Sequence, residues 1–122
     1  MSLCLLDKSA YVRGAYPGDQ VSELCLCAIT RLEVLYSARS EAGYRTLEDD
    51  LAQFRDLRID AQTVATAIGA QRELAALSAH RIPIPDLLIA ACAQQHAASV
   101  LHVDRHYETL ARVLVFEPRR VP

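Results

Sequence analysis

Four acidic side chains stand at the predicted ends of strands or in the first turns of helices. They are Asp7, Glu33, Asp86 and Asp104. Carboxylates that share one site repel one another, and a divalent cation relieves this repulsion. Clustered oxygen ligands without Cys or His suit Mg²⁺ or Mn²⁺. Such a centre can hydrolyse phosphodiester bonds, because one cation activates a bound water and a second, where present, stabilises the leaving oxygen.

Each acid also has a purely structural interpretation. Asp7, Asp86 and Asp104 could each cap a helix, where the dipole favours a negative charge. Glu33 could instead complete a capping box with Thr30, which precedes it by three residues. A shared site is favoured because all four acids fall at one end of the predicted sheet.

Short apolar runs alternate with longer helical segments along the chain. The predicted strands span 3–6, 23–29, 57–59, 99–103 and 113–116. The predicted helices span 9–16, 30–40, 44–55, 63–79, 86–98 and 105–111, with a turn at 17–19 and Asp60 as the N-cap before 63–79. This alternation indicates an α/β fold with four or five parallel strands, covered by helices on both faces. In such sheets the site lies at the carboxyl edge of the strands, where the four acids fall.

The composition fits one ordinary globular domain. The chain has 122 residues, of which 52% are hydrophobic and 23% are charged. It contains no apolar run near the ~18 residues of a membrane span and no basic region of a signal peptide, so we expect a cytoplasmic protein. The cysteines at 4, 25, 27 and 92 form no C-x-x-C pair and are expected to be reduced and buried. The net charge of −2 would be +2 without the four acids, so it neither requires nor excludes RNA as a partner.

Four blocks of the sequence resemble the PIN domain, and more narrowly the VapC toxins of bacterial toxin–antitoxin pairs. They read "LLDKSA" (5–10), "ITRLEVLYSAR" (29–39), "IPDLLIAACA" (84–93) and "LHVDRHYETLA" (101–111). The resemblance implies one PIN domain over residues 1–122, folded as three α/β/α layers. It implies a Mg²⁺- or Mn²⁺-dependent endoribonuclease that forms homodimers. It also implies a VapB-type antitoxin whose C-terminal arm covers the acidic site.

The resemblance also assigns residue roles. It gives catalytic roles to Asp7, Glu33, Asp86 and Asp104, with Asp7, Asp86 and Asp104 as the metal ligands, and a supporting polar role to Ser9. Many members carry a further acid two residues after the last aspartate, in a D-x-D-aromatic pattern, whereas this chain has His106 followed by Tyr107. His106 could ligate a metal, contact a phosphate when protonated or cap a surface turn, and we favour the last two.

Several arginines fall near the proposed edge and could support RNA binding. They are Arg13, Arg31, Arg39, Arg81 and Arg105. Guanidinium groups suit bidentate contacts to phosphate, although a solvated surface position explains each of them equally well. His102, in a predicted strand, is expected to be a satisfied core or rim residue.

Other α/β functions fit the residues less well. A receiver domain needs a lysine on a late strand, and the single lysine is Lys8. A dinucleotide-binding domain needs a Gly-rich turn after the first strand, which the four glycines do not form. The remaining alternative is a catalytically silent PIN-like module that only binds or assembles, and the complete acid set argues against it.

Two apolar helical stripes, at 32–36 and 47–54, look larger than one small core can cover. We therefore expect one or both of them to form a homodimer surface.

Overall fold

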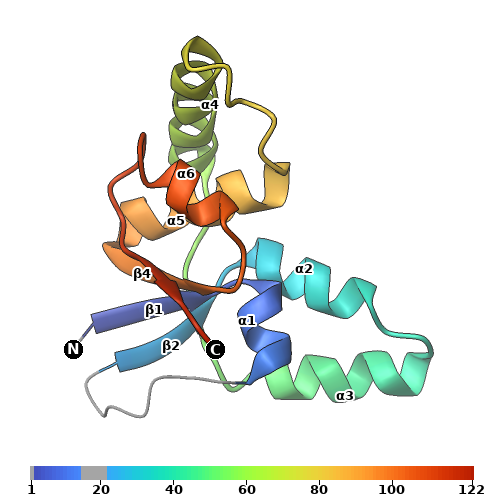
Figure 1. Ribbon diagram of the computed structural model, residues 1–122. Helices are drawn as coiled ribbons and strands as arrows, with labels where there is room; N and C mark the ends of the chain where they lie inside the picture. The colour runs from blue at the N-terminus through green and yellow to red at the C-terminus, as the bar shows by residue number, and fades with distance from the viewer. Residues whose placement is uncertain (1, 15–21) are drawn as a thin grey trace.

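Five parallel strands form a single sheet in the order β3-β2-β1-β4-β5. The structure, a computed structural model, describes residues 2–14 and 22–122 (Figure 1). The strands are β1 (Ser2–Leu6), β2 (Ser22–Leu26), β3 (Arg55–Asp56), β4 (Ala98–His102) and β5 (Pro118–Arg120). The helices are α1 (Lys8–Arg13), α2 (Ala28–Tyr36), α3 (Glu41–Leu51), α4 (Ala61–Ala76), α5 (Ile84–His96) and α6 (His106–Leu110). The predicted α/β class with a parallel sheet is confirmed.

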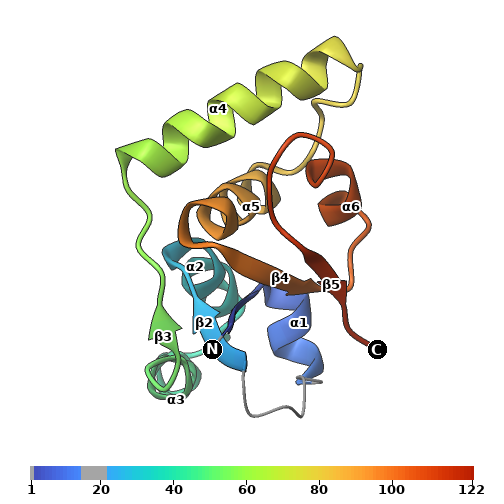
Figure 2. The same cartoon turned by 90° about the vertical axis from the view of Figure 1, so that its left-hand side faces the viewer.

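Helices cover both faces of the sheet. Figure 2 shows α4, α5 and α6 on one side and α1 and α3 on the other, while α2 contacts both α3 and α5. Successive strand residues point to opposite faces. Leu5 therefore joins the core cluster under α4 and α5, whereas Cys4 and Leu6 join the cluster under α1 and α3. This double burial explains why the predicted strand at 3–6 is apolar throughout.

The ends of the helices follow local sequence signals. Asp60 caps α4 in a complete capping box with Thr63, which confirms that prediction. Gly14 adopts a left-handed backbone with φ of 66° and ends α1 at Arg13, whereas the predicted helix spans 9–16; residues 15 and 16 of that prediction lie outside the described residues. The predicted turn at 17–19 lies outside the described residues.

Two strands lie elsewhere than predicted. β3 forms at Arg55–Asp56 rather than at 57–59, and pairs with the end of β2. The predicted strand at 113–116 is wrong, because Leu114 and Phe116 pack against the core under α4 and α5 from an irregular segment. The last strand is instead β5, which pairs with β4 from Val100↔Pro118 to His102↔Arg120. Proline is tolerated there because Pro118 is the first residue of an edge strand.

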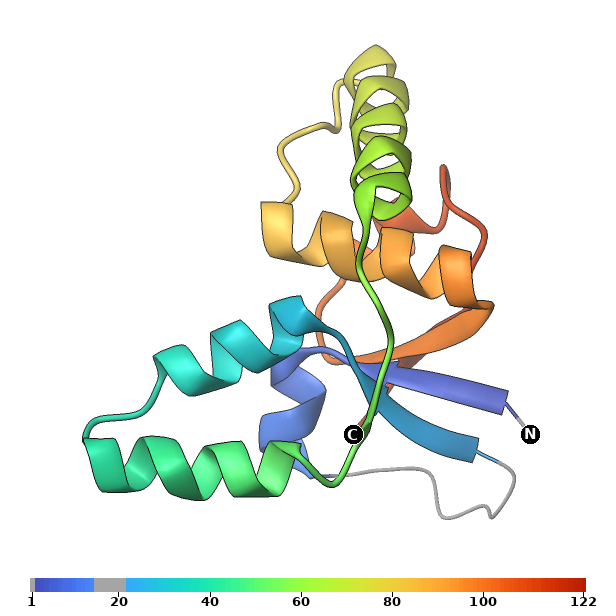
Figure 3. The same ribbon diagram turned by 180° about the vertical axis from the view of Figure 1, so that it is seen from behind.

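The two apolar stripes have different environments. Leu51 is buried, and Leu47 and Phe54 are partly buried in the core under α1 and α3. The stripe at 47–54 is therefore internal, and of the two stripes expected at a dimer surface only 32–36 is available for one. In α2 the buried residues are Thr30 and Val34, whereas Leu32 is 64% exposed and Tyr36 is 90% exposed. Figure 3 shows α2 and α3 side by side at one end of the molecule.

The four cysteines are buried and free, as predicted. Within residues 2–14 and 22–122, no helix combines the length and the apolar character needed to cross a membrane.

Candidate active site

A hollow of about 380 Å³ at the carboxyl edge of the sheet gathers all four predicted acids. They arrive from four places in the chain: the end of β1, the middle of α2, the start of α5 and the turn after β4. The hollow is lined by Asp7, Lys8, Ser9, Val12, Arg13, Glu33, Asp86, Val103 and Asp104. The topology thus brings together side chains that are up to 97 positions apart in the sequence.

Asp7 is the most enclosed of the acids, with 5% of the residue exposed. Its Oδ1 accepts hydrogen bonds from the Ser9 hydroxyl at 2.6 Å and from the Ala10 backbone N–H at 2.9 Å. The Ser9 Oγ also accepts a bond from the Val103 N–H at 3.3 Å. Ser9 therefore links the acid after β1 to the turn after β4, which carries Asp104.

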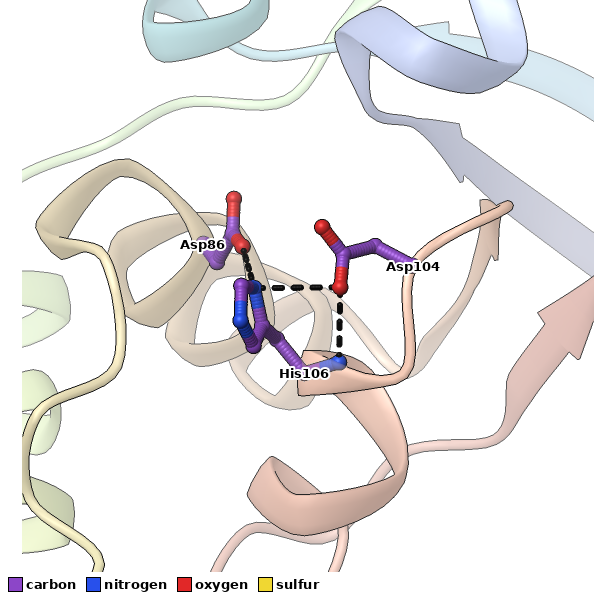
Figure 4. Close-up of side chains that lie close together, drawn as sticks. All are labelled: Asp86, Asp104 and His106. Atoms are coloured by element: carbon purple, nitrogen blue, oxygen red, sulfur yellow. Dashed lines mark hydrogen bonds and ion pairs between the residues drawn. The ribbon is translucent and has the colours of Figure 1, made fainter.

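Asp86 and Asp104 face the same imidazole ring. The Nδ1 atom of His106 lies 2.9 Å from Asp86 Oδ2 and 3.1 Å from Asp104 Oδ1 (Figure 4). Tyr107, which is fully buried, donates its hydroxyl to the other oxygen of Asp86 at 3.4 Å. Both oxygens of Asp86 are therefore held by residues at the start of α6.

Glu33 reaches the hollow from within α2 and not from its first turn. The helix begins at Ala28 with Cys27 as its N-cap, so the alternative interpretation, a capping box between Thr30 and Glu33, does not apply. Thr30 is instead buried, and its hydroxyl donates to the Leu6 carbonyl at 2.7 Å. This bond fixes α2 against the end of β1, next to Asp7.

Two of the acids bind backbone N–H groups at the start of a helix and also line the hollow. Asp7 is the N-cap of α1, and Asp104 accepts the His106 N–H at 3.0 Å where α6 begins. Asp86 lies in the first turn of α5, but the N-cap of that helix is Pro83. The structural interpretation therefore holds for Asp7, whereas Asp104 binds the first N–H of α6 from the position before the N-cap, which is Arg105; both acids also line the hollow.

The carboxylates disfavour one another's ionised forms. Burial raises the pKa of Glu33, and the neighbouring Asp86 and Asp7 raise it further, against a lowering by Lys8. Burial also raises the pKa of Asp86, with contributions from Asp7 and Asp104, while His106 lowers it. The site is therefore short of positive charge, as a cation-binding site is.

His102 supports the turn that carries Asp104. It is fully buried, and its Nδ1 accepts the Asp104 N–H at 3.1 Å. Burial lowers the pKa of His102, which keeps Nδ1 available as an acceptor. Its ring packs on Tyr107 with centroids 4.9 Å apart, and its Nε2 has no hydrogen-bond partner among the described residues. The expectation of a fully satisfied histidine is therefore met at only one ring nitrogen.

The predicted basic residues separate into different environments. Arg13 lines the hollow, and Arg105 is exposed beside Asp104. Arg31 is turned away, because it donates to Asp56 at 3.2 Å and to the Leu51 carbonyl at 3.0 Å. Lys8, which the sequence showed only as the single lysine, lines the hollow with Arg13. Its place directly after Asp7, at the start of a helix, was the available signal.

The donor set fits a divalent cation. Asp86, Asp104 and His106 each offer one ligand atom, and these atoms lie within 4.8 Å of one another. Asp7 lines the same hollow but is not part of this tight group. Two carboxylates and an imidazole suit Mn²⁺ and related ions, and carboxylates suit Mg²⁺.

Comparisons with known proteins agree with this geometry. The PIN domain family matches residues 6–113. Ribonuclease VapC17 of Mycobacterium tuberculosis is 42% identical over 120 residues, covering 93% of this chain and 90% of the relative. Ribonuclease VapC51 of the same organism is 38% identical over 108 residues, covering 88% and 79%.

A solved structure shows the same fold. The crystal structure of VapBC-5, a member of the VapBC family of toxin–antitoxin systems from Mycobacterium tuberculosis, superposes with a TM-score of 0.77 at 22% identity, covering 99% of this chain and 100% of that chain. From the family match and the two ribonucleases, the chain belongs to the PIN-domain family and, within it, to the VapC ribonucleases.

Proposed function

We propose that this chain is the toxin of a VapB–VapC pair, an endoribonuclease that cleaves RNA phosphodiester bonds in the cytoplasm with water activated by Mg²⁺ or Mn²⁺. The observation that carries the proposal is the convergence of four carboxylates, from four separate elements, in one hollow. Repulsion among these carboxylates lowers the stability of the fold, and the raised pKa values of Glu33 and Asp86 reflect this repulsion together with burial. Such an arrangement is typical of a functional site and is not expected in a catalytically silent module.

Each predicted residue has a role in this proposal. Asp7, Asp86 and Asp104 hold the cation, and Ser9 keeps Asp7 and the turn before Asp104 at a fixed separation. A divalent cation bound there would lower the pKa of a coordinated water and would stabilise negative charge on the phosphate oxygens.

Glu33 is the proton acceptor for the attacking water in this scheme. Its raised pKa brings it nearer to neutrality than an ordinary glutamate, which suits a general base. Lys8 and Arg13, which line the same hollow, bind the phosphates on either side of the cleaved bond, with Arg105 on the exposed rim.

The proposed partner is a VapB-type antitoxin that covers this hollow. The solved structure of VapBC-5 is that of a toxin–antitoxin family member, and that of VapBC2 from Rickettsia felis is bound to a promoter DNA fragment. An inhibitor could present a basic side chain to Asp7, Asp86 and Asp104 in place of the cation. It could alternatively present acidic side chains to the basic residues at the rim.

We also propose a homodimer, for which the exposed apolar residues of α2 provide support. Leu32 and Tyr36 lie 64% and 90% exposed on that helix. A hollow of about 400 Å³ next to the acidic one is lined by Lys8, Leu32, Glu33 and Tyr36. Exposed apolar residues that gather in this way are typical of protein contact surfaces.

The test is to express the chain without its antitoxin and to sequence the 5′ ends of cellular RNA. We expect new 5′ ends at defined positions with the wild-type chain and none with a folded Asp7→Asn variant. The same RNA profile from both proteins would favour the silent binding module.

A further inference from the structure

His106 occupies the position at which many PIN domains carry an acid, and its ring faces two of the four acids, Asp86 and Asp104. Its Nδ1 lies 2.9 Å from Asp86 Oδ2 and 3.1 Å from Asp104 Oδ1 (Figure 4). The three side chains come from α6, α5 and the turn after β4. This arrangement does not fit a histidine that merely caps a surface turn, because the ring itself faces two carboxylates.

Hydrogen bonds of the backbone of His106 and of the neighbouring Tyr107 fix the ring in this position. The His106 backbone N–H donates to Asp104 Oδ1 at 3.0 Å, which fixes the start of α6. The next residue, Tyr107, is fully buried and donates its hydroxyl to Asp86 at 3.4 Å. The same short segment therefore positions the imidazole and one of the carboxylates that it faces.

The spacing of Nδ1 from each of the two carboxylate oxygens fits one coordination sphere. Neighbouring ligands of a six-coordinate ion with bonds of about 2.1 Å lie about 3.0 Å apart. The two nitrogen–oxygen separations of 2.9 and 3.1 Å agree with that spacing. A cation that takes up this position would replace the hydrogen bonds of Nδ1 with bonds to the metal.

An imidazole ligand changes which cation the site prefers. Mg²⁺ favours oxygen ligands, whereas imidazole nitrogen suits first-row transition ions, and carboxylates and water suit Mn²⁺ as well as Mg²⁺. We propose that His106 is a direct ligand of the catalytic cation and that it shifts the selectivity of this site from Mg²⁺ toward Mn²⁺. The inference rests on the proposed metal-dependent function and adds the ligand that sets its metal preference.

The experiment is pulsed electron paramagnetic resonance on the Mn²⁺-loaded full chain, combined with calorimetric titration of Mn²⁺ and Mg²⁺. Imidazole nitrogen bound to Mn²⁺ produces nitrogen modulation of the electron spin echo, which is independent of catalytic activity. We expect this modulation in the wild-type chain and its loss in His106→Asp, which restores the acid of the family pattern. His106→Gln must lose it too, so the result does not depend on how one variant folds.

The matched control is His80→Asp, the same change at an exposed histidine outside the hollow. This control should keep the modulation and the wild-type preference for Mn²⁺ over Mg²⁺. In His106→Asp that preference should fall by about tenfold or more, the scale on which changes around a metal site act.

Two results would overturn the inference in different ways. The first is tight Mn²⁺ binding without nitrogen modulation, or with modulation that survives in both His106 variants. This result would show that His106 is not a ligand, and it would not affect the proposed metal-dependent nuclease. Absence of any Mn²⁺ or Mg²⁺ binding to the wild-type chain would remove the proposed metal-dependent function together with the inference.

Discussion

Replacement of Asp7 by Asn separates the chemical role of this residue from its structural role. The Asp7 Oδ1 caps α1 and accepts bonds at 2.6 and 2.9 Å, and an asparagine carbonyl can accept both. Asn and Asp are comparable N-caps. The exchange of charge-assisted bonds for neutral ones costs about 1 kcal/mol, and relief of repulsion from Glu33 offsets part of it. We therefore expect the free energy of unfolding to change by no more than about 1 kcal/mol.

The effect on activity should be much larger. Loss of a charged ligand weakens the cation that stabilises the transition state, so RNA cleavage should fall by at least about 100-fold, equivalent to about 2.7 kcal/mol. The assay compares cleavage rates at saturating Mn²⁺ with urea unfolding of the same preparations. A folded Asp7→Asn protein that cleaves at the wild-type rate would refute the assignment.

Asp60→Asn is the matched control for this experiment. Asp60 also caps a helix, with Oδ1 accepting from the Gln62 N–H at 3.1 Å and the Thr63 N–H at 3.3 Å. It does not line the acidic hollow. The variant should therefore change stability on a similar scale and leave cleavage unchanged.

Three further predictions concern charge, assembly and control. Because the folded-state pKa of Glu33 is raised, its ionisation lowers stability as pH rises past the ordinary value of 4.5. Metal-free Glu33→Gln should thus match the wild type in urea unfolding below that pH and exceed it near neutrality; equal stability at both would contradict the electrostatic account. Leu32→Asp should convert a dimer to a monomer, as measured by light scattering at micromolar concentration. The control is Val115→Asp, at a residue that is 83% exposed and lies outside α2, and this variant should stay dimeric. A wild-type protein that is monomeric at this concentration would contradict the proposed dimer. If the antitoxin inserts a cationic group among Asp7, Asp86 and Asp104, added Mg²⁺ should weaken its affinity for the purified toxin, and an affinity independent of Mg²⁺ would leave only steric covering or contacts at the basic rim.

The features that follow from strand and helix alternation could be predicted from the sequence. A run such as 3–6 is apolar at every position because it is buried on both faces, and this marks a central parallel strand. Parallel strands then place the residues that follow them at one edge. For this reason the convergence of Asp7, Asp86 and Asp104 could be predicted from the sequence alone.

Features that depend on tertiary partners could not be predicted in this way. The apolar run at 113–116 has strand composition, yet β4 pairs with Pro118–Arg120 instead, because backbone pairing and not composition defines an edge strand. The residue that fixes α2 to the sheet was not predicted either. Thr30 is buried and donates its hydroxyl to the Leu6 carbonyl, whereas Leu32 and Tyr36 of the predicted apolar stripe are exposed.

The orientation of a single ring was also beyond the sequence. The spacing of His106 from Asp104 is compatible with a cap, a phosphate contact or a ligand. Only the packing of Tyr107 and the position of Asp86 direct the ring toward both carboxylates.

The most direct test of the central claim is cleavage of total cellular RNA by the antitoxin-free chain after exhaustive removal of metal with a chelator. We predict no cleavage by the metal-free protein, full recovery when Mn²⁺ or Mg²⁺ is added, and no recovery in Asp86→Asn. Cleavage that proceeds at the same rate in the presence of chelator would contradict the assignment of the acidic hollow as a metal-dependent ribonuclease site.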